Sequence, residues 1–290
     1  MAIKIPDELK ADVPQTFWGK ILTATPIVMT VIATALAGLA SSEMTRGHYH
    51  LSLAGQRQSK AGDQWSFFQA KRLRGALQRN TLDVLQSTTE VHPLDLDESI
   101  DPVTRAALQQ GQLPEIGNGV ALDSNVKAAL EAVEATKPDA EIAALIMALP
   151  DPTLDAAIRG AKDRTLAFDA ATKPVNQAID RLEKQFSAKP NLRDFIAARL
   201  RYAAARYDGE ARLNQAVAVL YELQVRKSNL IAERHAKRSQ RFFYGMLAAQ
   251  AAVIMATFAI ATKKRSLLWS LAAAAGAGAV SFAIYVYLFV

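Results

Sequence analysis

The chain offers few side chains that could perform chemistry, and its four histidines are the first to consider. His48 and His50 lie two residues apart, a spacing that puts them on one face of a strand but on different faces of a helix. His92 and His235 are isolated in the sequence, and the carboxylate nearest to the pair is Glu43. Because a zinc site needs at least three protein ligands close together, this pattern predicts no metal site and no cofactor.

Other signatures of catalysis are missing from the sequence. The chain has no cysteine, which excludes disulfides, thiolate metal ligands and a cysteine nucleophile. It also contains no Ser-His-Asp arrangement, no glycine-rich phosphate loop and no Walker pattern. We therefore expect a protein without enzymatic activity, and the sequence identifies no small-molecule substrate.

The densest cluster of large side chains is the motif DQWSFFQAK at residues 63–71. Its aromatic residues put a large apolar area on adjacent faces of a helix, while its glutamines can form hydrogen bonds across a helix interface. Three interpretations are open: a seam for packing and oligomerisation, which we favour, a ligand pocket, or a part of the core. The candidate interaction residues are Asp63, Gln64, Trp65, Phe67, Phe68, Gln69 and Lys71.

The apolar residues around this motif recur at intervals of three, four or five. Trp65, Phe68, Leu73, Leu77 and Val84 follow this pattern, which predicts that they share one face of a helix. The same stretch has a basic flank, but its apolar residues are sparse for insertion into lipid. We expect this helix to pack in a bundle, not to lie on a membrane surface.

Three apolar runs are long enough to cross a bilayer as helices, at residues 21–41, 242–262 and 266–290. A short basic turn at 263–265 separates the last two runs, which predicts a transmembrane hairpin. The expected fold is all-α: an integral membrane protein with three transmembrane helices and an extended, coiled-coil-like helical domain outside the membrane. None of the runs contains Asp, Glu, Lys, Arg or His, groups that ion-coupled transporters usually carry.

The remaining sequence divides at composition changes and prolines. Asp101 and Asp151 each precede a proline, so each is predicted to cap a short helix. A helix from 154 to 187 is expected to be interrupted near Pro174, and an apolar seam that ends at Leu230 is interrupted by Lys227. The predicted segments are a polar tail (1–20), a membrane helix (21–41), a membrane-proximal helical segment with the motif (42–90), an acidic, proline-rich insertion of short helices (91–160), long basic helices (161–241), a membrane helix (242–262), a basic turn (263–265) and a membrane helix (266–290).

Charge is unevenly distributed along the chain. The net charge is +6, yet residues 91–160 contain 12 acidic and 4 basic side chains, whereas residues 161–241 contain 17 basic and 9 acidic ones. Because basic residues beside membrane helices are ordinary, the excess of positive charge does not predict a nucleic-acid partner.

Two stretches together resemble a known family: AGDQWSFFQAKRLRG at 61–75 and AERHAKRSQRFFYGMLAAQAAVIMATFAIATKKRSLLW at 232–269. They are similar to the bacterial membrane proteins grouped as domain of unknown function 4337. The resemblance implies one N-terminal membrane helix, a helical segment that opens with the motif, and a C-terminal helix hairpin. It covers both ends of the chain and not residues 91–160, which we interpret as an insertion of a longer member. The family implies no activity.

Two groups of basic residues give opposite indications of orientation. The turn formed by Lys263, Lys264 and Arg265 is expected in the cytoplasm, which would put residues 42–241 in the periplasm. A count of the basic residues that flank the membrane helices favours the opposite orientation. The domain side carries nine: Arg46, Arg57, Lys60 and the six from Arg226 to Arg241, of which Lys237, Arg238 and Arg241 are expected at headgroup level. The other side carries six, which are Lys4, Lys10, Lys20 and the turn. We slightly favour the periplasmic side, because a tight turn must follow its charges whereas long loops translocate largely regardless of theirs.

These observations favour a structural or interaction component of the bacterial inner membrane. Its expected partners are the lipid bilayer and either further copies of itself or other membrane subunits, to which it would be accessory. Small residues in the last run favour close helix packing: Ala274 and Gly278 are four apart, and Gly276 and Val280 continue the neighbouring face. The alternative is a channel or transport component in which the threonine-bearing first membrane helix lines a pore.

Overall fold

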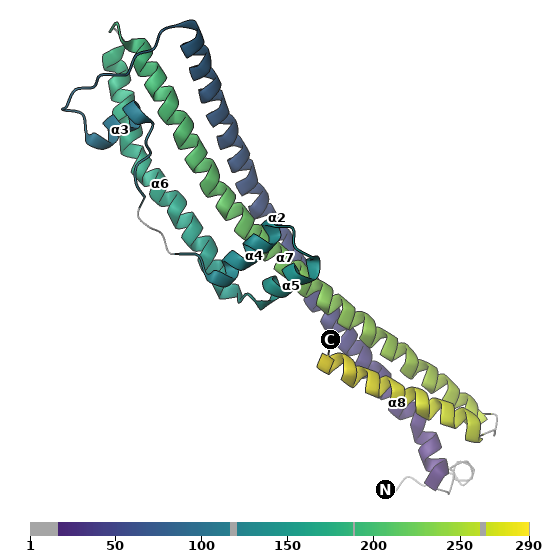
Figure 1. Ribbon diagram of the computed structural model, residues 1–290. Coiled ribbons are helices and arrows are strands. Elements are labelled where there is room, and N and C mark those ends of the chain that lie inside the picture. The colour runs from purple at the N-terminus through teal and green to yellow at the C-terminus, as the bar shows by residue number, and fades with distance from the viewer. Residues whose placement is uncertain (1–16, 117–120, 188, 262–264, 290) are drawn as a thin grey trace, which may run out of the picture. The chain divides into compact units, whose positions relative to one another are not determined.

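All regular structure in the described residues is α-helical, which confirms the predicted fold class. The computed structural model describes residues 17–116, 121–187, 189–261 and 265–289, without the side chains of residues 18, 19, 22, 261 and 265–269. The helices are α2 (Phe17–Thr88), α3 (Pro102–Gln110), α4 (Ser124–Glu134), α5 (Asp139–Ala148), α6 (Asp151–Phe186), α7 (Leu192–Ala261) and α8 (Arg265–Phe289) (Figure 1).

The chain forms two compact units. The membrane unit contains the described residues up to Ser52 and from Ser228 onward, and the polar unit spans Leu53–Lys227. The helices α2 and α7 contribute residues to both units, because each is a single helix that continues past the boundary. Among the described residues, α2, α7 and α8 are long and apolar enough to cross a membrane. The three predicted membrane helices are therefore present.

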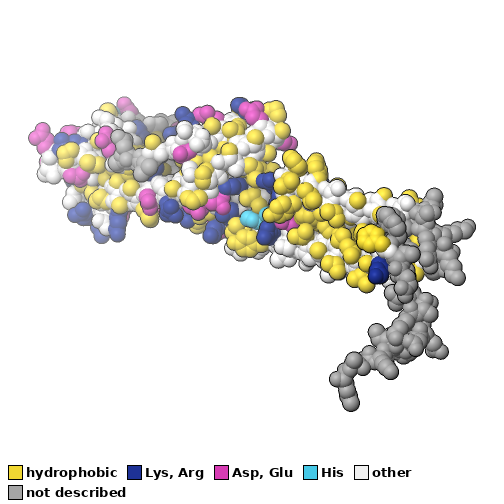
Figure 2. Space-filling model, turned by 90° about the horizontal axis from the view of Figure 1, so that it is seen from below, with side chains coloured by type: hydrophobic (Ala, Val, Ile, Leu, Met, Phe, Trp, Pro, Cys, Tyr) yellow, Lys and Arg dark blue, Asp and Glu magenta, His cyan; other side chains and the backbone are white. Residues whose placement is uncertain are grey.

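The membrane unit packs through small side chains where its three helices meet. Its core combines residues of α2, α7 and α8, and hydrophobic side chains also dominate its surface (Figure 2). Gly276 of α8 faces α2, where a methyl group at this position would overlap Met29. The predicted pair Ala274 and Gly278 is exposed instead. The intramolecular contact of α8 thus uses the helix face of Gly276 and not the face of Ala274 and Gly278. The core residues are Ala33, Leu36, Ala40, Phe242, Ala249, Ala279 and Val286.

The threonines of the first membrane helix bond to their own backbone. The hydroxyls of Thr25, Thr30 and Thr34 each donate to the carbonyl four residues earlier, at 2.8–2.9 Å. Such back-bonding satisfies a hydroxyl within an apolar environment.

Three long helical segments lie side by side in the polar unit: the later part of α2, α6, and the first part of α7 (Figure 1). Part of the predicted insertion is integral to their core, because Leu94, Leu96 and Leu108 are buried with residues of α6 and α7. At the junction of those two helices, the rings of Phe186 and Phe195 stack with centroids 4.9 Å apart. Residues 91–113 therefore contribute to the main core of this unit.

The helix boundaries confirm some predictions and correct others. Asp101 caps α3 as expected, since its carboxylate accepts a hydrogen bond from the Thr104 amide at 2.8 Å. Asp151, in contrast, is the first residue of α6, and no side chain caps that helix. Nor does α6 break at Pro174. The carbonyl that loses its partner there belongs to Ala170, an exposed residue that water can reach.

In the sequence, Lys227 interrupts the apolar seam of α7. In the structure, this lysine joins α7 to two other helices. Its side chain is buried, and its ammonium donates to the carbonyl of Leu149, at the end of α5, and to the carboxylate of Asp151. The last carbonyls of a helix lack partners within the helix and attract positive charge. The lysine thereby satisfies the end of α5 and fixes the start of α6.

We predict that Tyr202→Phe does not destabilise the protein near neutral pH. Tyr202 is 2% exposed, and its hydroxyl has no hydrogen-bond partner among the described residues. Removal of an unpartnered buried hydroxyl should leave the free energy of unfolding unchanged or raise it by about 1 kcal/mol. Thermal unfolding of the purified variant, followed by circular dichroism, checks this expectation, and a clear loss of stability would contradict it.

The same substitution should change how stability depends on alkaline pH. Burial raises the pKa of Tyr202 to about 12, from 10.0 in an unfolded chain. Between these values the unfolded state releases its proton first, so the wild type loses stability as the pH rises from 10 to 12. Tyr202→Phe lacks this contribution and should lose less stability over that interval. Identical slopes for the two proteins would refute the assignment.

Candidate functional site

The DQWSFFQAK motif lies on α2 within the polar unit, and its residues divide between two faces of the helix. Trp65 and Lys71 reach α7, and Gln64 and Phe68 are half-buried. The rest of the motif is exposed and consists of Asp63, Ser66, Phe67, Gln69 and Ala70. The motif therefore combines an intramolecular contact with an outward surface.

Trp65 is connected to α7 by a hydrogen bond from its indole N–H. Its indole nitrogen donates to Glu222 at 2.8 Å, and its ring meets Phe68 edge-on with centroids 5.3 Å apart. Arg72 lies over the Phe68 ring, with its guanidinium carbon 5.8 Å from the ring centroid. A buried tryptophan usually needs such a partner for its N–H, so Glu222 fixes the orientation of the motif.

Ion pairs continue the contact between α2 and α7 beyond the motif. Lys71 pairs with Glu210, a buried carboxylate that also lies 3.5 Å from Arg206. Eight residues further along α2, Arg79 binds both carboxylate oxygens of Asp208 on α7. Hydrogen bonding to Asp208, together with its negative charge, raises the pKa of Arg79. These pairs define the register of the two helices.

The predicted single apolar face of α2 is wrong, because its residues lie on two faces. Leu73, Leu77 and Val84 are 64%, 54% and 61% exposed. The face toward the bundle is built instead from Ala61 and Leu82, with Gly75 between them against Tyr207 and Asp208. We call the exposed series the outer seam; it consists of Ala70, Leu73, Leu77, Asn80 and Val84.

A cluster that the sequence did not predict lies in the membrane unit, directly after the apolar part of α2. Glu43 is 8% exposed, and its carboxylate is 2.7 Å from Nδ1 of His235 on α7. The ring of His50 stacks on His235 with centroids 5.6 Å apart. Nearby, Ser239 donates to the carbonyl of Ala40 at 2.7 Å. The sequence offers only one weak signal for this site, which is that polar residues follow an apolar run. The residues of α2 and their partners on α7 are almost 200 positions apart in the chain, so no local pattern connects them.

These groups do not form a metal centre. In the part of the chain that the structure describes, no group of three or more His, Cys, Asp or Glu side chains could hold a metal ion. The cluster instead satisfies polar groups where α2 and α7 leave their apolar segments.

The basic residues chosen as orientation signals are only partly described. Lys237 is exposed and pairs with Glu233 at 2.6 Å, while Arg238 and Arg241 are half-buried. Lys263 and Lys264 lie outside the described residues, as does the side chain of Arg265.

We predict that Glu43→Ala destabilises the protein by about 1–3 kcal/mol, because it leaves the ring nitrogen of His235 without its partner in a site of low solvent access. The matched control is Glu233→Ala, which removes a carboxylate from an exposed pair on α7 and should cost less than about 1 kcal/mol. Thermal unfolding of both variants in the same detergent compares them. Equal effects would show that the buried pair contributes no more than a surface pair.

The comparisons with known proteins give one match. A family model described as a domain of unknown function, DUF4337, matches residues 23–146; no curated protein and no solved structure matches the chain. The matched range differs from the expected one, because it runs through residues 91–146 and does not include the C-terminal helix pair. Residues 23–146, less than half of the chain, are therefore similar to the DUF4337 family.

Proposed function

We propose that the protein is a non-enzymatic structural component of the membrane that self-associates through the outer seam of α2. The observation that carries this proposal is the exposure of three large apolar side chains, Leu73, Leu77 and Val84, along one line of a helix whose opposite face is already packed. Exposed apolar side chains are ordinary when scattered singly, but a continuous line of them marks an interaction surface.

The spacing of the outer seam fits a second copy of the same helix. Its members recur at intervals of three and four residues, the a and d positions of a coiled coil. Such a seam is self-complementary when two copies meet about a two-fold axis. Asn80 occupies one d position, and a single polar residue in a seam restricts the register and the number of strands.

The charges beside the seam are compatible with a parallel pair. Two copies inserted in the membrane with the same orientation would bring their α2 helices together in parallel. Gln69 of one copy would then lie beside Arg74 of the other, and Asp83 beside Thr88. No like charges would meet at these flanking positions.

Disulfide cross-linking of a single introduced cysteine can test the seam, because the natural sequence contains no cysteine that would compete. We expect Leu77→Cys to form a disulfide-linked dimer when isolated membranes are treated with a mild oxidant, since facing a positions bring two Cβ atoms close together. Leu166→Cys is the control; Leu166 is also exposed, at 66% against 54% for Leu77, but lies on α6 and not on the seam. Equal cross-linking at 77 and 166 would contradict the proposal.

Disruption of the seam gives the complementary result. Leu77→Glu should convert the detergent-purified oligomer to monomer, measured as particle mass by light scattering, while Leu166→Glu should not. Both variants should keep the wild-type melting temperature, because both side chains are exposed. A monomeric wild type, or a stoichiometric foreign subunit in its place, would overturn self-association and favour an accessory role.

The location that we propose is the bacterial inner membrane, with residues 42–241 on the periplasmic side. The three candidate spans and the resemblance to a group of bacterial membrane proteins support it, together with the short basic turn at 263–265. A reporter fused after Val290 should then be active only in the periplasm; activity only in the cytoplasm would reverse the orientation. The back-bonded threonines of α2 do not favour the alternative of a pore.

A further inference from the structure

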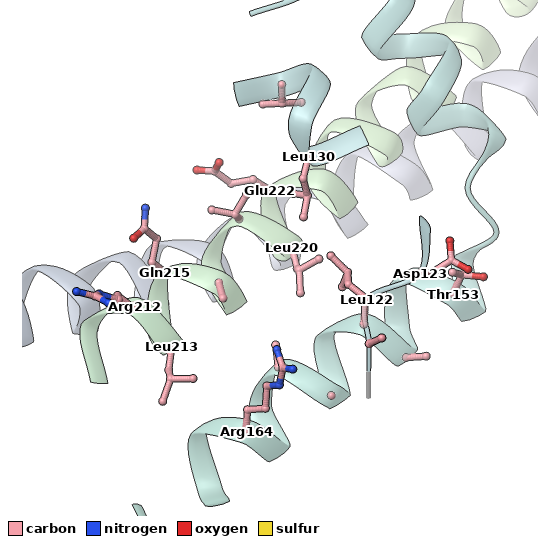
Figure 3. A pocket seen from close by; sticks show the side chains of 18 of the residues that line it. Leu122, Asp123, Leu130, Thr153, Arg164, Arg212, Leu213, Gln215, Leu220 and Glu222 are labelled. Atoms are coloured by element: carbon pink, nitrogen blue, oxygen red, sulfur yellow. The ribbon is translucent and has the colours of Figure 1, made fainter. Parts of the chain in front are cut away.

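A cavity of about 1060 Å³ lies within the polar unit, between α6 and α7 (Figure 3). Residues 121–123 and α4 close one side, and Trp65 of the motif contributes to its wall. The volume is at the upper limit of the roughly 300–1,000 Å³ that is usual for small-molecule sites.

The walls of the cavity are mainly apolar. Space remains between the two helices because α6 carries very small side chains where it faces α7. Ala157, Gly160 and Ala161 leave space opposite Leu213 and Leu220 of α7. From Thr153 to Arg164, the lining part of α6 extends over twelve residues, a rise of about 17 Å at 1.5 Å per residue. The cavity is therefore long enough for an extended acyl chain.

Two arginines stand at the same end of this apolar surface. Arg164 points from α6 toward the space before α7, and Arg212 lies on α7 at that end, whereas Asp123 and Thr153 mark the other end (Figure 3). Within the described part of the chain, neither arginine forms a hydrogen bond or an ion pair. A guanidinium binds a carboxylate through two parallel hydrogen bonds.

The acidic residues of the lining do not neutralise these arginines. Asp123 caps α4 by accepting from the amide of Asn125 at 2.9 Å, and Glu222 accepts the indole N–H of Trp65. Glu134 is the last residue of α4. The charge pattern is thus polarised, with free positive charge at one end, while Asp123 and Glu222 elsewhere in the lining are already hydrogen-bonded.

We propose that this cavity binds a long-chain fatty acid or a similar anionic lipid with a single acyl chain. The chain lies along the small residues of α6, and the carboxylate binds Arg164 and Arg212. The site is separate from the outer seam of α2, so that ligand binding and self-association can fail independently.

The experiment uses the full chain in lipid nanodiscs and a photoactivatable palmitate analogue, with the labelled peptides identified by mass spectrometry. We expect labelling in the segments 152–164 and 212–222, competed by palmitate but not by neutral hexadecanol or by acetate. Labelling confined to the membrane spans, or equal competition by hexadecanol, would overturn the proposal.

Two variants test the two ends of the site. Arg164→Gln with Arg212→Gln should weaken competition by palmitate about tenfold or more, as loss of a charge-assisted contact does. Arg159→Gln is the control, an exposed arginine of α6 outside the cavity lining. Gly160→Phe should abolish labelling by filling the cavity without distorting the fold, since no atom lies within 4 Å of a Cβ placed there. Unchanged labelling in either variant would refute the proposed site.

Discussion

The pairing of α2 with α7 is the constraint on which the rest of the structure depends. In the membrane unit, Glu43 meets His235, and Ala40 meets Ser239. In the polar unit, Lys71 meets Glu210, and Arg79 meets Asp208. Within each unit the partner's number falls on α7 as it rises on α2, so that the two helices are antiparallel. Each helix must present a face suited to lipid in one segment and a face suited to a polar bundle in another.

The contacts of this pair differ in what they contribute. Exposed ion pairs such as Arg79 with Asp208 add little free energy, because water competes for both partners. Loss of a partner costs more free energy at a buried group. An unpaired Glu210 or Glu43 would keep the full cost of its desolvation without the compensating contact. Apolar contacts at Ala61, Gly75 and Leu82 supply the burial, and the polar contacts select one register.

Small residues at helix contacts have opposite consequences in different places. Gly75 and Gly276 allow close approach of neighbouring helices, where a methyl group would meet Asp208 or Met29. Gly160 and the alanines beside it are not filled by a neighbour and leave a cavity instead. The residue type alone does not distinguish these outcomes. They depend on whether the facing helix presents side chains long enough to fill the space.

The sequence by itself determined the all-helical class, the three membrane helices and the cap at Asp101, because apolar length, periodicity and capping depend on neighbours in the chain. It also singled out the motif at 63–71, of which Trp65 and Lys71 contact α7. Only the tertiary structure decided which face of α2 is buried, that His235 meets Glu43, and that Lys227 satisfies the end of α5. These partners are between 76 and 192 residues apart, and no local pattern specifies which distant group will satisfy a buried charge.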